Sequence, residues 1–250
     1  MSAQTQAPVG RPALAGHVVV VIGGSSGMGL ETARRAHVEG ANVILVGRNP
    51  EHLEHAAREV GAQRTAAFDA YDPAALQSFF QGLPTSVDHV MVTAGAPHYG
   101  SPLTMPLEEV RRGLSEHLML VLEVARYAAN TVRPLGSTTF IGGTGSRRPR
   151  AGVAIASTVT MALPTLIANL ALELAPIRVN LIAPGFVDTP LSASILGGDL
   201  DKRRAELRAT LPIRRVVEPT DVAALAVHIM SNTALTGATF DIDGGQQLVE

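Results

Sequence analysis

A glycine-rich run near the amino terminus is the first segment whose residue types and spacing suggest chemistry. It reads GGSSGMG at positions 23–29 and directly follows the apolar run VVVVI at 18–22. Glycines keep the turn tight and let the backbone approach a phosphate, whose charge is met by the free N–H groups of a helix N-terminus. An ordinary strand-to-helix turn is the alternative, but four glycines in seven residues argue against it. We therefore predict a pyrophosphate site at Gly23, Ser25, Ser26, Gly27, Met28 and Gly29.

The residues after the next apolar run bear on which dinucleotide would bind. Proteins that prefer NAD place a carboxylate there for the ribose hydroxyls, whereas a 2′-phosphate calls for a basic side chain. Here Gly47 stands at that place and is followed by Arg48 and Asn49. This pattern favours NADP(H) over NAD(H). The alternative is that Arg48 is only a solvated arginine at a strand end.

Three arginines, Arg147, Arg148 and Arg150, lie within four residues of one another. Guanidinium groups bind carboxylates and phosphates in a bidentate geometry, so this cluster could hold an anionic group. A solvated run of charges is the other interpretation.

Alternating short β-branched runs and longer segments rich in Ala, Leu, Glu and Arg indicate the elements that would position these residues. The pattern is that of repeated βαβ units, and continuous apolar strands predict a parallel sheet covered on both faces. We therefore expect a single Rossmann-type, doubly wound α/β domain of about seven strands with helices on both faces. Strands are expected at 17–22, 42–47, 65–68, 87–93, 137–141, 178–182 and 238–242. Helices are expected at 29–40, from Pro50 to near Gly61, from Pro73, at 106–131 and 153–174, and up to Ser231 after a loop-rich lobe that ends near Thr220.

Composition limits the classes of function. At 250 residues and 46% hydrophobic content, one domain at 14–250 after a loose tail at 1–13 accounts for the chain. A net charge of −2 with interspersed acids and bases argues against a nucleic-acid partner. The absence of cysteine removes thiolate chemistry and cysteine-ligated metal, and we expect no metal site. With no long apolar stretch and no signal-like h-region, we expect no membrane span and a cytoplasmic protein with a small-molecule substrate.

Five motifs in order make the chain resemble the short-chain dehydrogenase/reductase family from about residue 14 to 248. They are the glycine run, Phe68-Asp69-Ala70, Thr93-Ala94-Gly95, the stretch from Leu172 to Thr189, and Gly237 to Gly245. The resemblance implies that the cofactor is also contacted by Asp69, Ala70, Ala94, Gly95, Pro184, Gly185, Val187 and Thr189. It also implies self-association as a tetramer or dimer through residues 106–131, 153–175 and 238–248.

The usual catalytic side chains of that family do not carry over. The family uses a serine, a Tyr-x-x-x-Lys pair and an asparagine. An ungapped count back from Leu172-Glu173 places Ala156 and Thr160 at the tyrosine and lysine positions, and Gly143 falls at the serine position. His117 stands at the asparagine position. The remaining catalytic candidates are His117, His98, Thr144 and Thr160. A histidine near its ordinary pKa of about 6.5 can give or take a proton, so His117 leads and His98 is second. A structural histidine bonded to a backbone carbonyl is the alternative for His117.

Two functions therefore remain open. One is an NADPH-dependent oxidoreductase that reduces a small carbonyl, enone or imine compound without a tyrosine proton donor. The other is a catalytically inactive NADP-binding sensor or scaffold protein.

Overall fold

The computed structural model describes residues 12–83 and 86–249. Most of the expected tail, residues 1–11, lies outside the described residues. Packing begins at Leu14, whose side chain is fully buried and whose N–H donates to the carbonyl of Glu39 at 3.0 Å.

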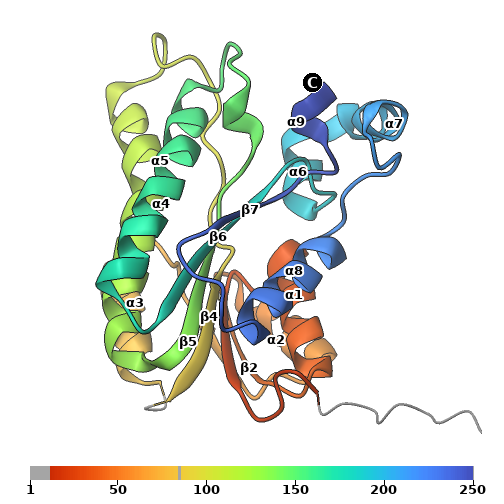
Figure 1. Ribbon diagram of the computed structural model, residues 1–250. Coiled ribbons are helices and arrows are strands. Elements are labelled where there is room, and N and C mark those ends of the chain that lie inside the picture. Colours follow the sequence, from red (N-terminus) through yellow and green to blue (C-terminus); the bar gives the residue numbers. More distant parts are fainter. Residues whose placement is uncertain (1–11, 84–85, 250) are drawn as a thin grey trace, which may run out of the picture.

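Seven parallel strands form one sheet in the order β3-β2-β1-β4-β5-β6-β7 (Figure 1). The strands are β1 (Val18–Ile22), β2 (Asn42–Gly47), β3 (Arg64–Ala67), β4 (Val87–Val92), β5 (Val132–Ile141), β6 (Arg178–Pro184) and β7 (Thr239–Ile242). The predicted doubly wound Rossmann sheet is confirmed. The order reverses between β1 and β4, and ligands of such sheets bind outside the carboxyl ends of the strands at that point.

Helices cover both faces of the sheet (Figure 1). One layer holds α3 (Pro73–Gln81), α4 (Leu107–Thr131) and α5 (Ala154–Glu173), and the other holds α1 (Gly27–Val38), α2 (Pro50–Val60) and α8 (Pro219–Ser231). Each layer has its own apolar core. The fully buried Leu163 and Ile167 of α5 belong to the first core, whereas Ala33 of α1 and Ile229 of α8 belong to the second.

The lobe after β6 is helical, which corrects the expectation of a loop-rich segment. It contains α6 (Pro190–Leu196), the short 3₁₀ turn η2 (Gly197–Asp199) and α7 (Leu200–Thr210), and α9 (Gln246–Val249) lies near it in Figure 1. Pro190 occupies the first turn of α6, and Thr189 and Ser192 form a capping box. Proline at that position and a hydroxyl cap both favour helix initiation, so these residues explain why the segment folds.

Helix α5 is long and apolar enough to cross a membrane by length and composition, with a mean hydropathy of 1.6. In this fold it packs on the sheet through Ile155, Leu163 and Ile167, while Met161 and Leu172 are exposed. A core helix of a globular domain passes the same test, and α5 occupies that position here.

Candidate functional site

The glycine run forms a cradle that side chains would fill. Gly23 has a φ of +95°, and a Cβ atom on it would lie 2.6 Å from the backbone nitrogen of Ala94. The hydroxyl of Thr93 donates to the carbonyl of Gly23 at 3.1 Å, and a Cβ atom on Gly29 would collide with that same carbonyl. The end of β1 and the loop after β4 therefore meet so closely that only glycine fits at these two positions.

The N-terminus of α1 opens from this cradle without a cap. Ser26 is the N-cap residue in an extended conformation, its side chain makes no capping hydrogen bond, and the first turn carries no acidic residue. The first N–H groups of a helix have no partner within the helix and attract anions. The free N–H groups at the start of α1 are therefore suited to bind a pyrophosphate at the predicted loop. Gly27, Met28 and Gly29 form the first turn of this helix.

The end of β2 lies beside the glycine run. A Cβ atom on Gly47 would lie 3.0 Å from Ser25 Oγ, so a larger side chain at this position would press on the loop. Arg48 is exposed and makes no hydrogen bond or ion pair among the described residues. Asn49 caps α2, because its Oδ1 accepts from the N–H of His52 at 3.1 Å. Residues 47–49 thus present one guanidinium and no carboxylate.

After β3, Asp69 and Ala70 form the turn that the family resemblance assigns to the adenine. Asp69 Oδ1 accepts from the N–H of Tyr71 at 3.1 Å, and Ala70 is buried.

A cavity of about 590 Å³ lies where the loops after β4, β5 and β6 meet α5 and α6. It brings together predicted residues from distant parts of the sequence, namely Met28, Ala94, Gly95, His98, His117, Thr160, Pro184, Gly185, Val187 and Thr189. The other predicted cofactor residues, at 23–27, 29, 48–49 and 69–70, lie outside its lining. Thr144 also lies outside the lining. It is buried, and its hydroxyl faces the carbonyl of Pro184 at 3.5 Å.

Three residues at the family's catalytic positions line the cavity but offer no acidic proton. Gly143 and Ala156 have no functional group. The hydroxyl of Thr160 donates to the carbonyl of Ala156 at 2.9 Å, one turn earlier in α5. Its methyl group lies 3.7 Å from where a Cβ atom on Gly143 would stand.

Among the described residues, His117 makes one hydrogen bond, to a backbone carbonyl. Its Nε2 lies 3.0 Å from the carbonyl of Ile141 at the end of β5, and because a carbonyl only accepts, Nε2 must carry the proton. Burial lowers the pKa of His117, against a smaller opposing effect of this hydrogen bond. The expectation of an unperturbed histidine pKa is therefore corrected. The neutral ring leaves Nδ1 as an acceptor beside Gly95, 3.0 Å from where a Cβ atom on that residue would stand.

Tyr71 is a cavity residue that the sequence reasoning missed. Its hydroxyl lies 2.8 Å from the same point beside Gly95, so the phenol and His117 Nδ1 flank one position. Burial raises the pKa of Tyr71 to about 12, with smaller contributions from Glu116 and Asp69, so the phenol keeps its proton at neutral pH. Its place in the turn after β3 could have drawn attention to it, because the carboxyl ends of parallel strands face the site.

His98 enters the cavity from the loop after β4. It packs on Gly113 of α4, where a Cβ atom would lie 3.0 Å from the imidazole Cγ. Its Nε2 lies 3.3 Å from Glu116 Oε2, a contact that becomes an ion pair when the ring is protonated. The carboxylate orients this ring as the Ile141 carbonyl orients that of His117.

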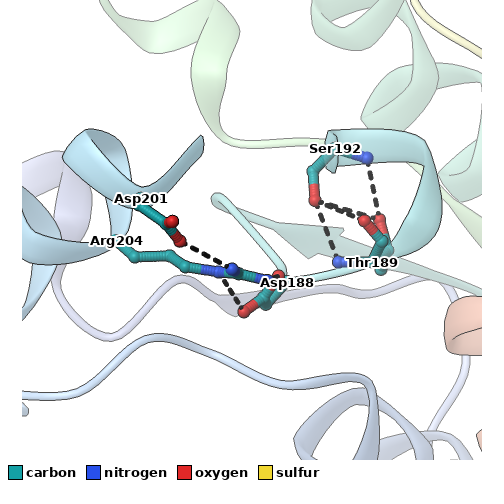
Figure 2. Close-up of polar contacts among 5 residues, drawn as sticks. All are labelled: Asp188, Thr189, Ser192, Asp201 and Arg204. Atoms are coloured by element: carbon teal, nitrogen blue, oxygen red, sulfur yellow. Dashed lines mark hydrogen bonds and ion pairs between the residues drawn. The ribbon is translucent and has the colours of Figure 1, made fainter. Parts of the chain in front are cut away.

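Hydrogen bonds and ion pairs connect the α6–α7 lobe to Asp188 and Thr189, which lie between β6 and α6 (Figure 2). Arg204 of α7 donates from Nε and Nη2 to the two oxygens of Asp188, both at 2.8 Å, and from Nη1 to Asp201 at 3.0 Å. The next residue, Thr189, accepts from the N–H of Ser192 at 3.1 Å. These contacts hold α6 so that its apolar residues Leu191, Ile195 and Leu196 line the cavity.

Comparisons with known proteins agree with this arrangement. Residues 22–247 match the family model described as enoyl-(acyl carrier protein) reductase. The NADP-dependent (R)-specific alcohol dehydrogenase of Lentilactobacillus kefiri is 30% identical over 93% of this chain and 97% of its own length.

Solved structures show the same fold. The MalC reductase/Diels-Alderase of Malbranchea aurantiaca has a TM-score of 0.88 at 24% identity, covering 95% of this chain and 99% of its own. An actinorhodin polyketide ketoreductase solved with NADPH has a TM-score of 0.83 at 26% identity, covering 92% and 97%. The cofactor cradle, the cavity beside it and these matches together place the chain in the short-chain dehydrogenase/reductase family of oxidoreductases.

Proposed function

We propose that this chain is an NADPH-dependent reductase of a small carbonyl, enone or imine compound, and that its proton donor is not a tyrosine. The observation that carries the proposal is that one cavity is lined both by Met28, in the uncapped first turn of α1, and by His117 and His98. A pyrophosphate held at α1 would thus place the rest of a dinucleotide toward two imidazoles. When bound, NADPH supplies the hydride.

The preference for NADPH rests on the corner after β2. Arg48 is exposed there and makes no hydrogen bond or ion pair among the described residues, and Gly47 supplies no carboxylate at the position that would favour NAD. The L. kefiri relative is named NADP-dependent and the ketoreductase was solved with NADPH, which supports the same choice.

His117 is the leading proton donor and His98 the second. With Nε2–H committed to Ile141, only the imidazolium form of His117 carries a proton on Nδ1, on the side of Gly95 and Tyr71. Burial lowers the pKa of His117, so this form is scarce at neutral pH but is a strong acid when present. Losing general-acid help costs roughly 10² to 10⁴ in rate, so an electrophilic substrate such as an enone or iminium suits this site.

The test is a panel of ketones, enones and imines, with oxidation of NADPH followed by its absorbance. Turnover of an enone or imine, with slower or no turnover of simple ketones, supports the proposal. Binding of NADPH is measured separately by fluorescence titration. If NADPH binds and no panel member is reduced, the reductase proposal fails.

A non-catalytic NADP-binding sensor or scaffold is the second candidate. The observation that favours it is that Gly143, Ala156 and Thr160 supply no proton donor to the cavity. The panel decides between the two, because only the reductase consumes NADPH.

We also propose that copies of the chain associate through α4 and α5. These neighbouring helices expose Leu107, Met119, Met161 and Leu172, with exposed fractions of 70%, 48%, 57% and 79%. Burial of these side chains against a second copy would remove apolar surface from water, which favours association. Light scattering at micromolar concentration should give a dimer or tetramer, and a monomer would contradict this proposal.

A further inference from the structure

The three arginines of the loop after β5 separate into two groups in the structure. Arg147 forms an ion pair with Asp241 of β7, with Nη1 and Nη2 at 2.5 Å and 2.7 Å from the carboxylate oxygens, and it also contacts Gln247. Arg148 donates from Nη2 to the carbonyl of Gln247 at 3.0 Å. These two arginines fasten the loop to the carboxyl-terminal segment and are not available for a ligand.

Arg150 is different. It lines the cavity, is exposed, and makes no hydrogen bond or ion pair among the described residues. A second arginine, Arg203 of α7, also lines the cavity and is paired with Glu206 at 3.0 Å. Of the described residues that line the cavity, none is aspartate or glutamate. The described lining therefore carries positive charge and contains no carboxylate that could neutralise Arg150.

On the side of the lobe, apolar side chains line the cavity together with the polar residues Thr189, Ser192 and Gln246. Phe186 and the α6 residues Leu191, Ile195 and Leu196 line the same cavity. Leu191 and Ile195 are 41% and 46% exposed, which is surface that a ligand could cover. A cleft whose charged residues are all of one sign attracts ions of the opposite sign.

We propose that the substrate carries a carboxylate on an apolar body, and that Arg150 binds the carboxylate while α6 and Phe186 cover the apolar part. This inference rests on the proposed function for the reaction but concerns recognition of the substrate. The cofactor does not account for Arg150, since its pyrophosphate is assigned to α1 and its 2′-phosphate to Arg48. Arg150 is thus a specificity-determining residue that selects acidic substrates over neutral ones of the same shape.

The test uses octanoate and 1-octanol as probes, because they share an alkyl chain and differ in charge. Isothermal titration on the NADP⁺-saturated protein should show octanoate binding at least tenfold more tightly than 1-octanol. Arg150→Gln should weaken octanoate roughly tenfold to hundredfold, as expected for loss of a charge-assisted hydrogen bond, and leave 1-octanol unchanged. Arg150→Lys should retain part of the octanoate affinity, because it keeps the charge but loses the planar fork.

The matched control is Arg208→Gln, which removes the same charge from an exposed arginine of α7 outside the cavity lining. It should leave octanoate affinity within twofold of the parent. Equal losses in Arg208→Gln and Arg150→Gln, or equal affinity of octanoate and 1-octanol in the parent, would overturn the inference. The same titrations on the protein without cofactor separate the two proposals, since a failure of NADP⁺ to bind counts against the proposed function and not against recognition by Arg150.

Discussion

The methyl group of Thr160 contacts the place where Gly143 lacks a side chain: a Cβ atom on Gly143 would lie 3.7 Å from Thr160 Cγ2 and 3.6 Å from the carbonyl oxygen of Pro184. Both separations are ordinary van der Waals distances, so a small side chain fits at residue 143. Ala156, whose carbonyl accepts the hydroxyl of Thr160, lines the same cavity one turn away on α5.

This relationship predicts that tyrosine-dependent chemistry can be installed. The triple variant Gly143→Ser, Ala156→Tyr, Thr160→Lys should reduce simple ketones with NADPH about 10² to 10⁴ times faster than the parent, because a phenol with a nearby lysine supplies general-acid help. The measurement is the initial rate of NADPH oxidation, with Gly143→Ser alone as the control. A folded triple variant that binds NADPH and shows only the parent's rate would contradict the placement of these residues around the reacting centre.

The second prediction concerns cofactor selectivity. Arg48→Ala should weaken NADPH roughly tenfold to hundredfold and leave NADH unchanged, because only the 2′-phosphate would contact the guanidinium. Fluorescence titration of both cofactors measures this. Arg208→Ala, which removes an exposed arginine from α7, controls for the change in net charge. Equal binding of NADH and NADPH by the parent protein would refute the preference.

The third prediction concerns pH. Since burial lowers the pKa of His117, the rate of reduction of a substrate from the panel should rise as pH falls through a value below 6.5. His117→Ala should remove this limb and lower the rate about 10² to 10⁴-fold, while NADPH still binds. The rate of His117→Asn, which restores the family's side chain, shows whether a polar group that cannot donate a titrating proton is enough for reduction. If the limb persists in His117→Ala, the proton comes from His98, from the phenol of Tyr71 or from solvent, and a Tyr71 donor would contradict the non-tyrosine mechanism.

The fourth prediction concerns acid stability and lies far from the cavity. His89 is buried between His17 and Ser137, with its two ring nitrogens at 3.1 Å and 2.8 Å from them, and burial is the main cause that lowers its pKa to about 3. Between pH 6.5 and 3 the unfolded chain binds a proton that the folded chain does not. The free energy of unfolding should therefore decrease as the pH is lowered from 6.5 to 3. This residue contributes at most about 1.4 kcal/mol per pH unit.

The His89→Gln variant should lose less free energy of unfolding than the parent between pH 6.5 and 5, by up to about 2 kcal/mol. Urea unfolding at several pH values measures this difference. The exposed His55 provides the control, and His55→Gln should keep the parent's slope. An unchanged slope in His89→Gln would show that this histidine is already charged in the folded protein.

The fold was predictable because its signals are local. Apolar runs bounded by glycine and proline define strands and helices, and the motif order then selects the topology. The lobe was missed because α6 is short and depends on the capping pair Thr189 and Ser192.

The site was predictable only in part, because side-chain roles depend on contacts that are distant in sequence. Arg147 and Arg148 are engaged by Asp241 and Gln247, more than 90 positions away, so the sequence could not separate them from Arg150. The lowered pKa of His117 likewise depends on burial that no motif encodes.

Transfer of deuterium from NADPH that carries deuterium at both C4 positions of the nicotinamide tests the central claim most directly. The protein is incubated with the labelled cofactor and the panel of ketones, enones and imines, and each product is analysed by mass spectrometry. The account predicts one deuterium in the reduced product of an enone or imine, and loss of that label transfer when NADPH is replaced by NADH at the same low concentration. Tight binding of NADPH with no label in any product would contradict the claim that this chain is a reductase.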